Sequence, residues 1–163
     1  MTEWHTLSDA EIIELATRLR SLDWSWRMSD IPQLAAEFGW DVQSLGARSA
    51  ILDVGFGMAS GGVQGRGDQA EVIEVAVTSR ASRDAAGQAS LRDSFARMTS
   101  TLTGSLGEPS SRQPGEVPEI RWAGEKTTLQ LMCLRTTVRL YLVTNSWLAL
   151  HDKTIELQEQ GLI

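Results

Sequence analysis

Apolar residues recur at helical spacing near the start of the chain. The spacing from Ile12 to Leu19 predicts an amphipathic helix over residues 9–20. Ser8 and Glu11 stand at the two positions of a capping box, in which each side chain satisfies a free backbone amide. The first helix is therefore expected to begin directly after Ser8.

A second helix is predicted after Ser29 and Asp30. These residues are typical helix caps, and Pro32 is tolerated in a first helical turn. Gly39 is expected to end this helix because glycine readily adopts the left-handed conformation that terminates helices.

Two runs rich in β-branched residues, 50–54 and 71–77, predict strands. They flank the sequence GFGMASGGVQGRGD, residues 55–68, which holds six glycines. The pattern predicts an antiparallel hairpin whose two strands are joined by this long glycine-rich connection.

The second half of the chain predicts a long helix, a short meander and a last helix. Leu91, Phe95, Met98 and Leu102 form a helical stripe between residues 84 and 106. A proline-containing surface connection follows over residues 108–119. The expected elements after it are strands at 119–123, 127–133 and 138–143 and a helix at 147–160.

This order predicts an α+β fold with an antiparallel sheet of about five strands and helices packed on the sheet. The elements run helix, helix, hairpin, helix, meander, helix. The pattern allows either one continuous sheet or two small ones. The length of 163 residues and the 42% share of hydrophobic residues fit a single domain over residues 1–163.

The net charge narrows the classes of partner. With 15 basic and 21 acidic side chains the chain carries a charge of −6. An acidic surface opposes binding to nucleic acid and favours association with a basic protein. We therefore expect a protein partner and no nucleic acid.

The expected location is the cytoplasm. Cys133 is the one cysteine, so it forms no internal disulfide, and it lies in an apolar run typical of a buried thiol. The N-terminal residues lack the pattern of a signal peptide, and no apolar run is long enough to predict a membrane span.

Catalytic and cofactor motifs are missing from the sequence. The glycines at 55, 57 and 61 lack the spacing of a dinucleotide-binding loop, and no Gly-Lys-Ser/Thr follows them. No His, Cys or Asp pattern has metal-ligand spacing. A set of Cys133, His151 and Asp152 is the one nucleophilic arrangement to consider, and a core position for Cys133 is favoured instead. We expect no enzyme activity, no catalytic residue, no metal and no cofactor.

The glycine-rich segment is the first candidate for binding a partner. It is either a solvated, mobile hairpin tip or a loop whose backbone enters a concave surface closely. In the second case the Arg66 side chain could reach a carboxylate or phosphate. The candidate residues are Gly61, Gly62, Val63, Gln64, Gly65, Arg66, Gly67 and Asp68.

The second candidate lies between the first two helices. Trp24, Trp26 and Arg27 are residue types enriched at binding hot spots. Anchoring of at least one indole in the core is the alternative.

Four short sequences carry a resemblance to known proteins: LATRLRSLDWSW, SDIPQLAAEFGW, LGEP and EIRW. Together they resemble a family of small actinobacterial proteins. The chain is also similar to immunity proteins encoded beside secreted polymorphic toxins, including the immunity factor of the necrotizing NAD-glycohydrolase toxin. The resemblance implies a non-catalytic protein that binds its cognate toxin and blocks the toxin's active site.

Two functional hypotheses follow. In the first, the protein is an immunity-type inhibitor, a monomer that forms a heterodimer with its toxin, and residues 61–68 enter the toxin's active site. In the second, it is a secretion chaperone or adaptor that holds a segment of a secreted protein in a hydrophobic groove, often as a homodimer.

Overall fold

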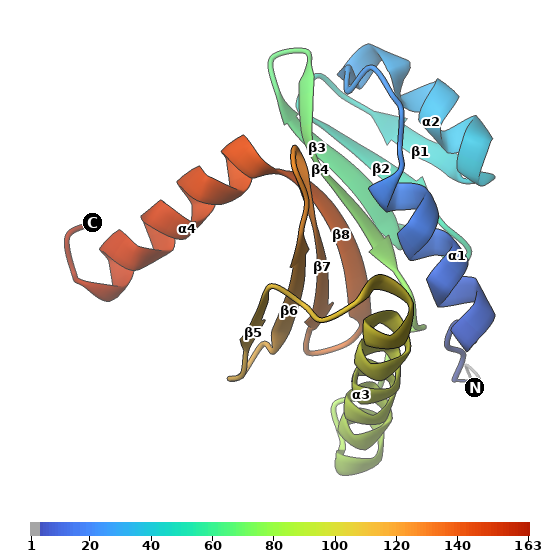
Figure 1. The fold of residues 1–163 in the computed structure, drawn as a ribbon. Helices are drawn as coiled ribbons and strands as arrows, with labels where there is room; N and C mark the ends of the chain where they lie inside the picture. Colours follow the sequence, from blue (N-terminus) through green and yellow to red (C-terminus); the bar gives the residue numbers. More distant parts are fainter. Residues whose placement is uncertain (1–3) are drawn as a thin grey trace.

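The computed structural model describes residues 4–163, which form four α-helices and one antiparallel sheet (Figure 1). The helices are α1 (Asp9–Arg20), α2 (Ile31–Phe38), α3 (Ala85–Leu106) and α4 (Asn145–Glu159), and a short 3-10 helix, η1 (Met28–Asp30), precedes α2. The eight strands are β1 (Asp41–Leu45), β2 (Ser49–Asp53), β3 (Gly61–Arg66), β4 (Gln69–Ala76), β5 (Ser111–Gln113), β6 (Glu119–Ala123), β7 (Thr127–Cys133) and β8 (Val138–Thr144).

The sheet is continuous, with the strand order β1-β2-β3-β4-β8-β7-β6-β5. After β4 the chain leaves the sheet through α3 and returns at the far edge as β5. It then works inward to β8, which pairs with β4 from Val72 opposite Val143 to Ala76 opposite Arg139. Because β4 pairs with β8, the two groups of strands form one continuous sheet and not two small sheets.

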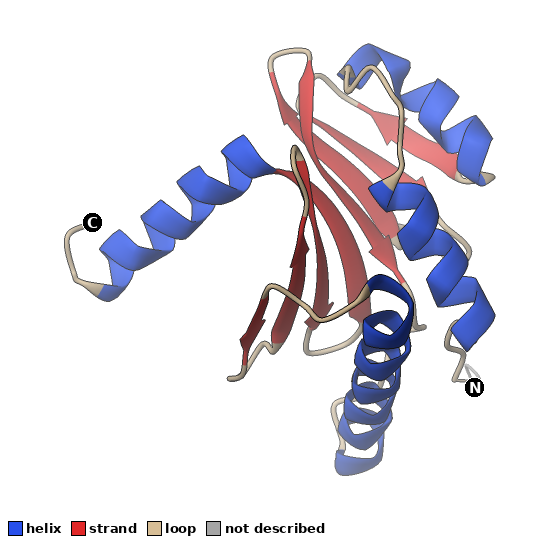
Figure 2. Cartoon of the chain, in the orientation of Figure 1, coloured by secondary structure: helices blue, strands red, loops and turns tan. Residues whose placement is uncertain are grey.

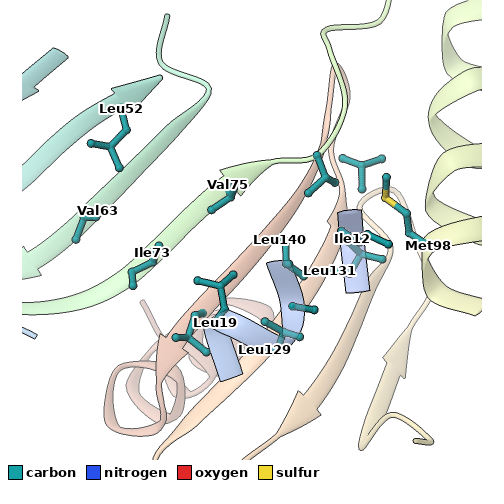
Figure 3. Close-up of a cluster of buried hydrophobic side chains, with 14 of the residues drawn as sticks. Ile12, Leu19, Leu52, Val63, Ile73, Val75, Met98, Leu129, Leu131 and Leu140 are labelled. Atoms are coloured by element: carbon teal, nitrogen blue, oxygen red, sulfur yellow. The ribbon is translucent and has the colours of Figure 1, made fainter. Parts of the chain in front are cut away.

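The main core lies between one face of the sheet and helices α1, α2 and α3 (Figure 2). Figure 3 shows Ile12 and Leu19 of α1 and Met98 of α3 among the inward side chains of the strands. Those strand residues are Leu52, Val63, Ile73, Val75, Leu129, Leu131 and Leu140. Because side chains alternate along a strand, the intervening residues point to the opposite face.

Local sequence signals set the start of α1 and the end of α2 as predicted, whereas Asp30, one of the predicted caps of α2, makes no side-chain capping hydrogen bond. Ser8 and Glu11 form the capping box of α1, with N–O distances of 3.2 and 2.9 Å. Gly39 ends α2 with a φ of 72°. The Asp84 carboxylate accepts a hydrogen bond from the Gly87 amide and caps α3.

The α+β class is confirmed, but the predicted number of strands is wrong, since the sheet has eight strands. The additional strands are β1, β3 and β5. The edge strand β5 has three residues inside the proline-containing connection, and β1 is mostly exposed. Neither segment carries the apolar alternation that marks a strand packed on a core.

The prediction that residues 61–68 form a loop is also wrong for Gly61–Arg66. These residues are β3, which pairs with β2 on one side and β4 on the other, so the predicted direct pairing of the strands at 50–54 and 71–77 is wrong as well. A Cβ at Gly61 would collide with Val54 Cγ1, and one at Gly65 would collide with the Gln69 carbonyl oxygen. The glycines therefore permit close approach within the sheet, and only residues 67–68 form a turn.

Within the described residues, no helix combines the length and apolar character needed to cross a bilayer.

Candidate functional site

The sheet face opposite α1, α2 and α3 carries a row of polar side chains. Glu74 on β4 stands opposite Tyr141 on β8, and Tyr141 stands opposite Gln130 on β7. Gln130 in turn stands opposite Arg121 on β6. We call this surface the open face, because α4 is the helix that lies over it and α4 covers only part of it (Figure 1).

Arg121 joins two carboxylates on the open face, near the β5 edge of the sheet. Its guanidinium donates two hydrogen bonds to Asp152 on α4, with N–O distances of 2.7 and 2.9 Å. It also donates to Glu119 on its own strand, at 3.1 and 3.3 Å. Gln130 donates to the same Glu119 carboxylate. These contacts satisfy the hydrogen-bonding groups of Arg121 and Glu119, which are nearly buried, whereas Asp152 is partly exposed.

The pair of Arg121 and Asp152 favours its ionised form. The hydrogen bonds to Asp152 raise the pKa of Arg121 above its already high ordinary value. The same hydrogen bonds hold the pKa of Asp152 below its ordinary value, although partial burial opposes this. This ionised pair therefore links β6 to α4.

A second ion pair lies beside the first. Arg139 on β8 approaches Glu74 on β4 with an N–O distance of 3.5 Å and also donates to the Ala59 carbonyl. Burial, with a smaller contribution from Glu74, raises the pKa of the Tyr141 hydroxyl. Tyr141 is therefore a neutral hydroxyl on this face.

Helix α4 is attached to the sheet at its N-terminal half. The Thr144 hydroxyl accepts a hydrogen bond from the Trp147 amide, and Asn145 donates to the Gly124 and Glu125 carbonyls. Leu148 packs on Val72 and Val143 in a small second core. Asp152 makes the last of these attachments, and the helix then extends away from the sheet (Figure 1).

A groove of about 580 Å³ lies between α4 and the open face. Its floor is formed by residues of the strands, and its wall by α4. The lining residues are Gln64, Val72, Glu74, Gln113, Glu119, Arg121, Gln130, Met132, Tyr141, Trp147, His151, Asp152, Ile155, Glu156 and Glu159.

The residues of the glycine-rich candidate, 61–68, do not lie together on one surface. Gly61, Gly62 and Val63 are buried within the sheet. Gln64 lines the groove, and Gly65, Arg66 and Gly67 line a neighbouring hollow of about 470 Å³ that also contacts Trp147. Asp68 accepts a hydrogen bond from the Met28 amide through its carbonyl.

The second candidate lies beside the β3–β4 turn. The Trp26 carbonyl accepts a hydrogen bond from the Ala70 amide at 2.8 Å, and the backbone of Arg27 forms an isolated antiparallel β-bridge with Gln69. The two indoles, Trp24 and Trp26, lie 5.5 Å apart and are half-buried against the main core. The structure thus brings Arg27 close to the turn at Asp68, while the indoles serve at least in part as packing.

The structure does not bring Cys133 together with His151 and Asp152, the possible nucleophilic set. Cys133 is buried in the main core, and burial raises the pKa of its thiol. His151 lies on α4, above the other sheet face, where its ring stacks on Trp147 at 4.6 Å. Within residues 4–163, no group of three or more His, Cys, Asp or Glu side chains is arranged to hold a metal ion.

Sequence reasoning missed the cluster around Arg121. Glu119 and Arg121 are separated by one residue in a strand, as are Gln130 and Met132, so each pair shares a face. That alternation was a visible signal, but it is also typical of any solvated sheet face. The partner that makes the cluster, Asp152, follows 31 residues after Arg121.

One protein-family model, described as "Family of unknown function (DUF6301)", matches residues 10–144. The chain belongs to this family. The DUF6301 match begins within α1 and ends with β8, so it includes the whole sheet and stops before α4. No curated protein and no solved structure matches the chain significantly.

Proposed function

We propose that this protein is a non-catalytic, immunity-type protein that binds a cognate secreted toxin enzyme through the open face and α4. The observation that carries the proposal is the one-sided covering of the sheet. Helices α1, α2 and α3 bury one face, whereas the other face has a groove and a partly detached helix. A surface of this kind offers a partner both a flat platform and a projecting wall.

The charge of the chain supports a basic toxin as partner. A net charge of −6 would accelerate encounter with a basic protein. A specific complex of ordinary size buries about 800 Å² on each partner, which a face of this sheet can supply.

The mode of inhibition we propose is covering of the toxin's active site. Insertion of a long glycine loop is no longer supported, because β3 is held on both sides within the sheet. Gln64 and Arg66 remain candidates for contact, since they lie at the rim of the groove and beside it. An NAD-glycohydrolase is one toxin class that fits the resemblance seen in the sequence.

A second candidate function is that of an adaptor for a segment of a secreted protein. The specific observation in its favour is the groove, together with exposed apolar residues on α4. Leu150 is 53% exposed and Ile155 is 38% exposed. Such residues on a partly detached helix are typical of a surface that another chain covers.

Co-purification with the product of the neighbouring gene tests the proposal. We expect a one-to-one complex with the C-terminal domain of that product by sedimentation, and loss of its enzyme activity in the complex. A complex that retains full activity would favour the adaptor. Absence of any complex would contradict both functions.

A further inference from the structure

We infer that the groove between α4 and the open face receives a basic, amphipathic segment of the partner protein. This inference rests on the proposed function and adds the binding site and the chemistry of the bound segment. Its basis is the combination of acidic and apolar side chains along the groove.

The groove carries an excess of negative charge. Five carboxylates line it, against one guanidinium: Glu74, Glu119, Asp152, Glu156 and Glu159, against Arg121. Glu74 is already paired with Arg139. Arg121 is already neutralised by Glu119 and Asp152. In the part of the chain that the structure describes, no cation forms an ion pair with Glu156 or Glu159. These two exposed carboxylates on α4 are therefore free to pair with lysine or arginine of a partner.

Apolar side chains also line the groove, beside the carboxylates. Ile155 lies on the same wall as Glu156 and Glu159, and Met132 contributes to the floor. Trp147 stands at the attached end of α4, where it also lines the neighbouring hollow. A segment with only positive charge would leave these groups exposed, whereas an amphipathic segment would cover them.

The distribution of charge along the groove also predicts which way round the bound segment lies. The hollow beyond Trp147 is lined by Arg48 and Arg66, with Glu71 at 4.0 Å from Arg66. The carboxylates Glu156 and Glu159 lie toward the other end of α4. The most basic part of the bound segment is therefore expected beside the C-terminal half of α4.

A second copy of this chain fits the groove poorly. The exposed part of α4 carries Lys153 against Asp152, Glu156 and Glu159. Placing one α4 in the groove of another copy would bring acidic side chains against acidic side chains, which is unfavourable. Charge therefore favours a different, basic protein as the occupant.

Fluorescence anisotropy with a labelled synthetic peptide tests the inference without the natural partner. The probe is an amphipathic helix of about 14 residues made of leucine and lysine, and its counterpart replaces every lysine with glutamate. We expect the lysine peptide to bind and the glutamate peptide not to bind. Comparable binding of both peptides, or of neither, would overturn the inference.

Matched variants locate the binding site. Glu156→Lys with Glu159→Lys should weaken binding of the lysine peptide by about tenfold, because two attractions become repulsions. Glu37→Lys with Glu116→Lys makes the same change in net charge at exposed positions outside the groove, so it should have an effect below about twofold. Equal weakening by the two pairs would show long-range attraction alone and would overturn the inference.

The apolar contribution has its own control. Ile155→Ser should weaken peptide binding by several-fold, whereas Val117→Ser should not, although Val117 is 41% exposed and Ile155 is 38% exposed. A homodimer in sedimentation that Ile155→Ser disrupts would place a second copy in the groove and would overturn the inference.

The outcomes separate this inference from the proposed function. If the groove variants leave peptide binding unchanged while the neighbouring gene's product is still bound and inhibited, the inference fails and the proposed function stands. If the groove binds the peptide as expected but the neighbouring gene's product is neither bound nor inhibited, the proposed function fails.

Discussion

Arg121 on β6 and Asp152 on α4 form a bidentate ion pair, with N–O distances of 2.7 and 2.9 Å. The pair links the open face to the helix that lies over it. Because Arg121 also binds Glu119, one guanidinium fixes both the floor and the wall of the groove. The geometry of the proposed binding site therefore depends on this side chain.

Asp152→Ala should loosen α4 and leave the rest of the fold intact. We expect a loss of about 1 kcal/mol in the free energy of unfolding, since Asp152 is 45% exposed and solvent screens part of the interaction. Amide hydrogen exchange should rise along α4 and remain unchanged in α1. Asp93→Ala on the exposed side of α3 is the control, and an equal effect there would contradict the role of Asp152.

Arg121→Met should be more costly than Asp152→Ala. It leaves the Glu119 carboxylate buried without its cation, and breaking a buried pair in this way costs about 3 kcal/mol. Adding Glu119→Gln removes the uncompensated charge, so the double variant should recover part of the loss in urea denaturation. A double variant no more stable than Arg121→Met would show that charge burial is not the cause.

Acidification should release α4 in a defined pH range. The pKa of Asp152 is held below its ordinary value of 3.8 by Arg121, so the stabilisation is present above that value. It is lost as the pH falls through the lowered pKa of the folded state. Protection factors of the α4 amides, which correct for the pH dependence of intrinsic exchange, should therefore fall below about pH 4 in the wild type. In Asp152→Asn the protection factors should be low already at neutral pH and change less on acidification.

Glycine substitutions should distinguish a strand from a loop at residues 61–66. Gly65→Ala places a Cβ against the Gln69 carbonyl oxygen, and we expect a loss of about 2 kcal/mol in the free energy of unfolding. Gly104→Ala on α3 meets no atom within 4 Å and should stabilise the protein by about 0.5 kcal/mol. A Gly65→Ala variant with unchanged thermal stability would contradict the pairing of β3.

Much of the fold could be predicted because local interactions decide it. The helix at residues 9–20 was predicted at its observed bounds, since its capping box and apolar spacing lie within the same segment. The predicted strands at 119–123 and 127–133 also agree with β6 and β7. In each case the signal comes from residues close together in the sequence.

The strand β3 could not be predicted from local propensity. Its glycines are poor strand formers, and in the sequence they resemble a flexible connection. They are favourable here because Val54 and the Gln69 carbonyl oxygen approach too closely for any side chain, which is a property of the assembled sheet.

The sequence by itself determined the helices, the capping box of α1, the end of α2 at Gly39, the meander strands and the acidic balance of the chain, because each depends on neighbouring residues or on composition alone. Only the tertiary structure decided that the strands join in one sheet and that α4 covers only part of the second face of this sheet. It also decided that Asp152 meets Arg121. The physical reason is that strand pairing and ion pairing over long separations depend on which surfaces the core burial of α1, α2 and α3 leaves available.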